Sequence, residues 1–172
     1  MPIWVTLTPE QIARADEVGK KRQENRLRVG AVNRNNKPTN AVADLADHIF
    51  GARCELASHI GLETKSWLDF AETLGRKRAD LDGFIEVRGR KESRHNLIVQ
   101  YTDPPEWAYV TVCAALHPDY SIDAWCWGWQ VQQDKYKRSL VPGRPAYVIS
   151  PADMMMKSAY ELKQLVLTRA SA

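Results

Sequence analysis

Two carboxylates and an arginine stand close together around a turn in the middle of the chain. Asp82 and the glycine after it are typical of a turn, and residues 84–88 alternate as a short strand does. Successive strand side chains point to opposite faces, so Glu86 and Arg88 share one face, and Asp80 reaches them from the turn. Two carboxylates beside a cation suit a hard divalent metal and a phosphodiester, because Mg²⁺ uses one or two carboxylates and leaves its other positions to water and phosphate.

The other face of this strand carries Ile85 and Val87, which we expect to be buried. Asp82 competes with Asp80 for the role of metal ligand, since both have the parity of Glu86. We prefer Asp80, because Asp82 before a glycine is explained by turn chemistry.

The pattern Asp80…Glu86-Val87-Arg88 resembles the signature of the PD-(D/E)xK nuclease superfamily, with arginine where the family usually has lysine. The likeness extends back to the segment around Glu55, which is similar to the first-helix segment where many members place a further acidic residue. It extends forward through the apolar stretches near residues 97–100, 107–112 and 120–125, and so covers about residues 48–150.

The resemblance implies a restriction-endonuclease-like α/β fold and metal-assisted hydrolysis of phosphodiester bonds. Asp80 and Glu86 would ligate Mg²⁺ or Mn²⁺, with Glu55 acting directly or through water. Arg88 would supply positive charge and a bidentate grip on phosphate, but it cannot act as a base because guanidinium stays protonated. The implied partner is DNA, although RNA and single-stranded or branched substrates stay open, and cleavage of both strands from one site per chain implies a homodimer.

Two other classes of protein agree with the same residues. Arg88 in place of lysine favours a non-catalytic DNA-binding or assembly protein on the same fold. The third reading is a small structural or inhibitor protein with carboxylates that only decorate its surface. Bound divalent metal would separate the nuclease from the structural or inhibitor protein, and metal-dependent cleavage would separate the nuclease from the non-catalytic DNA-binding protein.

Basic residues surround the acidic motif and also follow the first predicted helix. The net charge is only +3, but its distribution suits a polyanion held over a metal site. The alternative is a pair of solvated surface faces. The residues that we expect to contact DNA are Arg22, Arg26, Arg90, Lys91 and Arg94.

Two long helices should precede the motif. Thr8 as N-cap, proline next and Gln11 as the partner of a capping box predict a helix that runs to residue 27 or 29. A second helix should begin near residue 39 or 40 and run to residue 60, with Gly61 as its C′ residue. Its expected core stripe is Val42, Leu45, Ile49, Ala52, Leu56 and Ile60.

One flank of this second helix carries His48, Glu55 and His59. We reject a zinc site, because seven residues at about 1.5 Å rise separate His48 and Glu55 by about 10 Å. Glu55 is instead a candidate active-site carboxylate, with or without a histidine beside it, or else it forms a boundary salt bridge with Arg53 or Lys65.

Strands are predicted at residues 83–90, 95–101, 107–115 and 119–127, and their short connections imply antiparallel neighbours. Residues 130–139 should form a helix, 144–149 a last strand and 151–167 one or two closing helices. Residues 33–38 form a loop by composition. Residues 62–78 fit a short amphipathic helix, a strand pair or a substrate-side insertion equally well. The expected architecture is α/β, with a central mixed sheet flanked by helices.

Length and composition are those of one globular domain: 172 residues, 44% hydrophobic and 26% charged. We expect a basic N-terminal helix and loop (1–37), a nuclease-like core (38–150) and a C-terminal helical segment (151–172). No apolar run approaches the roughly 20 residues that span a bilayer, and the start lacks a secretory signal. Three cysteines without CxxC spacing indicate reduced thiols. The expected location is therefore the cytoplasm of a bacterial or phage-infected cell.

Overall fold

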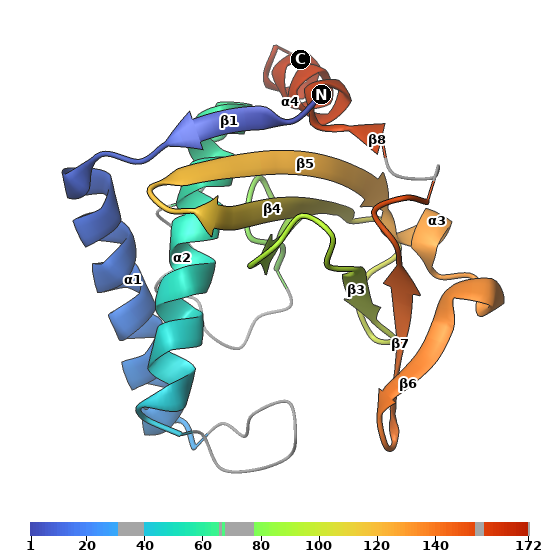
Figure 1. Ribbon diagram of the computed structural model, residues 1–172, viewed down its shortest axis with the longest axis horizontal. Coiled ribbons are helices and arrows are strands. Elements are labelled where there is room, and N and C mark those ends of the chain that lie inside the picture. The colour runs from blue at the N-terminus through green and yellow to red at the C-terminus, as the bar shows by residue number, and fades with distance from the viewer. Residues whose placement is uncertain (31–39, 66, 68–77, 154–156, 172) are drawn as a thin grey trace.

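The computed structural model describes residues 1–30, 40–65, 67, 78–153 and 157–171, and it has the mixed α/β architecture (Figure 1). Two long helices, α1 and α2, lie side by side at one end of the molecule. The helices are α1 (Pro9–Arg28), α2 (Ala43–Leu62), α3 (Gly128–Val131) and α4 (Ala159–Ala170). The strands are β1 (Ile3–Thr6), β2 (Ile85–Arg90), β3 (Leu97–Gln100), β4 (Ala108–Leu116), β5 (Asp119–Trp127), β6 (Lys137–Val141), β7 (Arg144–Ile149) and β8 (Lys157–Ser158).

Helix α1 begins as its sequence predicts. The Thr8 hydroxyl accepts a hydrogen bond from the backbone N–H of Gln11 at 3.3 Å, and the Gln11 side chain accepts one from the Thr8 N–H at 2.8 Å. This reciprocal capping box satisfies two backbone donors that the first turn of a helix leaves unpaired.

Helix α2 differs from its prediction at both ends. It begins at Ala43, and Val42, expected in the core stripe, is 83% exposed at its N-cap. It continues through Gly61 to Leu62 and ends at Glu63, which has a left-handed backbone (φ 58°). Gly61 therefore does not end the helix. A Cβ at Gly61 would lie 2.4 Å from Ile122 Cδ1, so this glycine allows α2 to pack closely on β5.

The strands form two sheets. The main sheet has the order β1-β5-β4-β2, and β8 also pairs with β5. Its pairs are antiparallel except β2 with β4, which are parallel, so the sheet is mixed. Strands β3, β7 and β6 form a second, antiparallel sheet in that order.

The main sheet lies between α2 and the small sheet. On one face, Val110 and Trp125 join the core that α2 supplies through Ala52 and Leu56. On the other face, the cross-strand neighbours Tyr109 and Cys126 join a second core with Leu97, Val99, Tyr147 and Ile149. The two long helices and the small sheet therefore stand on opposite sides of β4 and β2.

Three predictions about the strands are wrong. β2 and β3 are consecutive but do not pair, and neither do β3 and β4, because β2 joins β4 and β3 joins β7. Residues 130–139 are not one helix: α3 ends at Val131, a 3₁₀ turn covers Asp134–Tyr136, and β6 then pairs with β7. Strand β1 was not predicted. The β4–β5 hairpin and β7 are confirmed.

The closing segment is only in part as predicted, since β8 precedes a single helix over residues 159–170. The loop 33–38 and residues 68–77 of the segment without clear assignment lie outside the described residues. In the part of the chain that the structure describes, no helix combines the length and apolar character needed to cross a bilayer.

Candidate functional site

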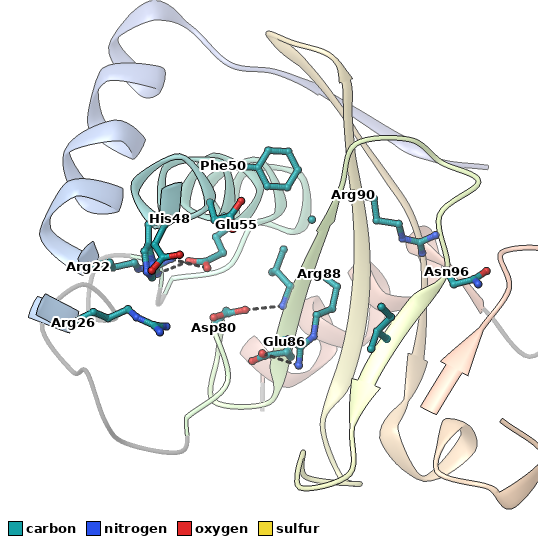
Figure 2. A pocket seen from close by; sticks show the side chains of 16 residues that line it. Arg22, Arg26, His48, Phe50, Glu55, Asp80, Glu86, Arg88, Arg90 and Asn96 are labelled. Carbon is teal, nitrogen blue, oxygen red and sulfur yellow. Dashed lines mark hydrogen bonds and ion pairs between the residues drawn. The ribbon is translucent and has the colours of Figure 1, made fainter. Parts of the chain in front are cut away.

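A polar cleft of about 830 Å³ opens between the α1–α2 pair and strands β2 and β3 (Figure 2). It brings together Glu55 from α2, Asp80 from the turn before β2, and Glu86 and Arg88 from β2 itself. The side chains around these four come from α1, α2, β2 and β3: Arg22, Arg26, Asp44, Asp47, His48, Phe50, Arg90, Asn96 and Ile98.

Glu55 pairs with an arginine from the neighbouring helix. Arg22 donates from Nη1 to Glu55 Oε1 at 2.7 Å and from Nη2 to Oε2 at 2.5 Å, and both residues are 6% exposed. A glycine makes this contact reachable, because a Cβ at Gly19 would lie 2.6 Å from Ile49 Cα. Glu55 is thus in a buried salt bridge, but with Arg22 rather than with Arg53 or Lys65.

Asp80 is held against the backbone of β2. Its Oδ2 accepts a hydrogen bond from the Val87 N–H at 2.7 Å, and the residue is 8% exposed. The predicted alternation of β2 is confirmed, since Ile85 and Val87 are buried and Glu86 faces the cleft. Asp82 has φ 51° in the turn, as its explanation by turn chemistry requires.

β2 approaches α2 closely at one glycine. A Cβ at Gly89 would lie 2.6 Å from Phe50 Cε1 and 2.9 Å from Cys54 Sγ. This close approach brings β2, which carries Glu86, next to the part of α2 that carries Glu55.

The carboxylates of the cleft affect one another electrically. Burial raises the pKa of Asp80 well above its usual range, and the nearby charges of Glu55 and Glu86 raise it further, against the Val87 hydrogen bond and Arg22, which lower it. The charges of Glu55 and Glu86 thus disfavour the ionised form of Asp80, and a bound cation would favour it.

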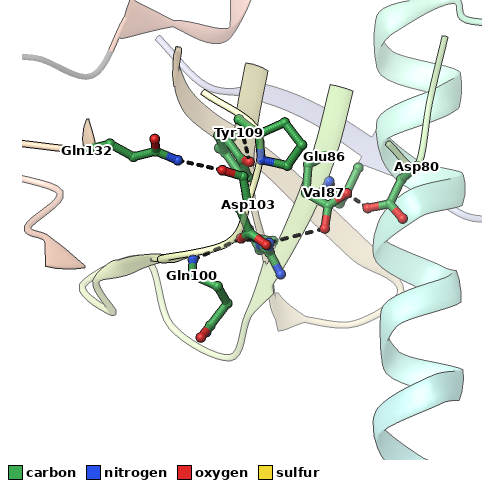
Figure 3. Close-up of polar contacts among 9 residues, drawn as sticks. Asp80, Glu86, Val87, Gln100, Asp103, Tyr109 and Gln132 are labelled. Carbon is green, nitrogen blue, oxygen red and sulfur yellow. Dashed lines mark hydrogen bonds and ion pairs between the residues drawn. The ribbon is translucent and has the colours of Figure 1, made fainter. Parts of the chain in front are cut away.

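Arg88 forms ion pairs with two carboxylates, those of Glu86 and Asp103, which Figure 3 labels. Its Nη2 is 2.7 Å from Asp103 Oδ2 and 3.2 Å from Glu86 Oε1. Its guanidinium carbon also lies 5.6 Å from the centroid of the Tyr109 ring, within reach of a cation–π contact. Both carboxylate contacts are made by the same guanidinium nitrogen, Nη2.

Asp103 itself is fixed by the loop that carries it. The Asp103 carboxylate accepts from the Gln100 N–H at 2.8 Å, and its carbonyl accepts from Gln132 Nε2 at 2.7 Å. The next carbonyl, of Pro104, accepts from the Tyr109 hydroxyl at 2.9 Å. Asp103 gave no signal in the sequence, because an aspartate before two prolines fits an ordinary turn.

The five residues expected to contact DNA separate into two groups. Arg22, Arg26 and Arg90 line the cleft, whereas Lys91 and Arg94 are exposed and outside its lining. Arg90 is only 5% exposed and donates to the backbone carbonyls of Ser93 and His95. Its guanidinium therefore orders the β2–β3 loop, while Arg94 pairs with Glu92 at the surface.

Other polar side chains of the cleft had little or no sequence signal. His48 shares the flank of α2 with Glu55, as its spacing predicted, and burial together with Arg26 and Arg22 lowers its pKa. His59, on the same flank, instead bonds the Thr64 hydroxyl and does not line the cleft. Asp44 and Asp47 from α2 and Asn96 from the residue before β3 also line the cleft.

The donors fit a hard cation in chemistry and in charge, but they are not arranged as a ready-made metal site. Carboxylate oxygens are the ligands that Mg²⁺ and Mn²⁺ prefer. Among the described residues, no three side chains of His, Cys, Asp or Glu are grouped so that they could hold a metal ion. In the same region, arginines are bonded to Glu55 and Glu86.

No protein family, curated protein or solved structure matches this chain.

Proposed function

We propose that this protein is a metal-dependent nuclease that hydrolyses phosphodiester bonds in DNA, on a restriction-endonuclease-like fold. One observation carries the proposal. Glu55, Asp80 and Glu86 come from three separate elements, yet they face one cleft, and arginines from α1 and β2 face it with them. Metal-assisted hydrolysis of a phosphodiester needs carboxylates that bind a cation next to arginines that bind a phosphate.

The residues have separate roles in this proposal. Asp80 and Glu86 hold Mg²⁺ or Mn²⁺, and Glu55 supports them directly or through water. When bound, such a metal lowers the pKa of water and neutralises charge on the phosphate. Arg88 stabilises negative charge on the phosphate as a fixed hydrogen-bond donor, and Arg22 and Arg26 bind neighbouring phosphates.

A second candidate function is DNA binding without cleavage. Arg88 favours it, because its guanidinium cannot take the proton of an attacking water as a lysine can. The cleft would then hold the nucleic-acid backbone, and the carboxylates would serve only to fix the arginines.

Cleavage of plasmid and single-stranded DNA with Mg²⁺, with Mn²⁺ or with EDTA tests the proposal. We expect metal-dependent cutting that Asp80→Asn and Glu86→Gln abolish, since both keep the shape of the side chain but remove its charge. Glu92→Gln is the matched control, because Glu92 pairs with Arg94 at the surface outside the cleft.

Three outcomes would contradict the proposal. Cutting that persists in both cleft variants would place the active site elsewhere or reveal a contaminant. A wild-type protein that shifts DNA in a gel but never cuts it would favour the binding function. A protein that neither cuts nor binds DNA would refute both. Parallel assays with RNA and branched DNA define the substrate, and sedimentation with and without DNA tests for a homodimer.

A further inference from the structure

Arg88 contacts its two carboxylates unequally. The contact of its Nη2 with Asp103 is 2.7 Å, and the contact with Glu86 is 3.2 Å. A charged hydrogen bond of the first length is near its optimum, whereas the second is at the long end. The ion pair of Arg88 with Asp103 is therefore the stronger contact, and the one with Glu86 is the weaker.

Asp103 is held in place by hydrogen bonds that do not involve Arg88. Its carboxylate is bonded to the Gln100 N–H and its carbonyl to Gln132. Tyr109 supports the same unit, because its hydroxyl bonds the Pro104 carbonyl and its ring lies beside the guanidinium. The anchor of Arg88 is thus tied by hydrogen bonds to a loop beside the second core, to which Tyr109 belongs, while its other contact faces the cleft.

Glu86 cannot serve a metal fully while Arg88 neutralises it. Glu55 is similarly engaged by both nitrogens of Arg22. An anionic phosphate that enters the cleft competes with these carboxylates for the arginines, because Arg binds phosphate in the same bidentate way as carboxylate.

We propose that Asp103 is a positioning residue about which Arg88 pivots, so that binding of a nucleic-acid phosphate draws Arg88 from Glu86 and opens Glu86 to the metal. This inference rests on the proposed function. It adds that DNA and metal bind cooperatively, and that Asp103 keeps Arg88 at the cleft after Glu86 is released. By linkage, the metal must then raise the affinity for DNA by the same factor.

The test measures Mn²⁺ binding by the loss of the spectroscopic signal of free Mn²⁺, and not by cleavage. The probe is phosphorothioate DNA, double- or single-stranded according to the form that the protein cleaves. For the wild type, we expect DNA to tighten Mn²⁺ binding by about tenfold or more, within the usual range of coupling between two sites.

Phosphate oxygens could tighten Mn²⁺ binding by acting as ligands, without any movement of Arg88. Arg88→Met separates these causes, because it removes the competing cation while DNA is absent. We expect it to bind Mn²⁺ about fivefold or more tightly than the wild type without DNA. Arg14→Met is the control, since Arg14 pairs with Glu17 on the exposed face of α1 and should leave Mn²⁺ binding unchanged.

Asp103→Asn tests the anchor. Loss of its charge should leave Arg88 with Glu86, so Mn²⁺ binding in the presence of DNA should weaken several-fold. A residue with only a structural role would lower the melting temperature but leave this affinity unchanged.

The outcomes separate this inference from the proposed function. Equal Mn²⁺ affinity with and without DNA, in a wild type that cuts DNA, refutes the pivot and leaves the nuclease intact. No gain for a folded Arg88→Met, or unchanged Mn²⁺ binding by Asp103→Asn with DNA, also refutes it. If Arg88→Met does not fold, Asp103→Asn decides, because ligation by phosphate oxygens alone would leave its Mn²⁺ affinity in the presence of DNA equal to that of the wild type. No Mn²⁺ binding and no cutting under any condition refutes the nuclease itself.

Discussion

The salt bridge between Arg22 and Glu55 offers a direct measure of how strongly the cleft is held together. Its side chains are only 7% and 8% exposed, and two hydrogen bonds join them. Arg22→Met leaves the Glu55 carboxylate buried without its main partner. Removal of one member of a buried pair costs about 3–5 kcal/mol in the free energy of unfolding. For a chain of this length, that corresponds to a fall in melting temperature of roughly 6–20 °C.

Urea denaturation of the wild type, Arg22→Met, Glu55→Met and the double variant at neutral pH measures this effect. Two apolar side chains can pack where the pair was, so the double variant should recover most of the loss. Arg14→Met provides the comparison, because the exposed pair of Arg14 and Glu17 should contribute less than about 1 kcal/mol. The reasoning is refuted if Arg22→Met costs no more than Arg14→Met, or if the double variant is as unstable as Arg22→Met alone.

Three further predictions concern stability. Asp80→Asn should stabilise the protein at neutral pH in EDTA. The raised pKa of Asp80 means that folding favours the protonated acid, so the stability of the wild type falls as pH rises from about 4 through the folded-state pKa. Urea midpoints across this range should show that the variant is more stable than the wild type at neutral pH and that the gain disappears at low pH. Gly89→Ala should lower the free energy of unfolding by about 1–3 kcal/mol, because its Cβ would overlap Phe50 and Cys54. Gly51→Ala, whose Cβ would have no atom within 4 Å, should raise it by about 0.5–1 kcal/mol. Equal effects of the two substitutions on melting temperature would contradict the close approach of β2 and α2. Tyr109→Phe should cost about 0.5–1.5 kcal/mol by removing the hydrogen bond to the Pro104 carbonyl, and an unchanged urea midpoint would count against that bond.

Local patterns predicted the parts of the site that local structure determines. The alternation of β2 placed Glu86 on the open face, the turn separated Asp82 from Asp80, and the capping box fixed the start of α1. Each of these depends on residues within a few positions of one another.

Contacts between distant segments could not be predicted in this way. Arg22 meets Glu55 only because Gly19 lets α1 and α2 approach, and Asp103 meets Arg88 only because β2 pairs with β4 rather than with β3. The polar residues 137–139 form a strand because β7 supplies a pairing partner, and such pairing overrides weak local preference. Gly61 was predicted to end α2, but a glycine is required there because Ile122 leaves no space for a Cβ.

The hydrogen bond between Asp80 and the Val87 N–H also matters for the behaviour of the protein in solution. β2 is the last strand of the main sheet in the described part of the chain, and the open side of such a strand can recruit a strand from another molecule. The Asp80 carboxylate accepts a hydrogen bond from the Val87 N–H, one of the donors that a strand from another molecule would use. We therefore expect it to disfavour aggregation through this edge. Asparagine at this position keeps an acceptor for the same donor, whereas alanine does not. Light scattering should therefore show more self-association for Asp80→Ala than for Asp80→Asn.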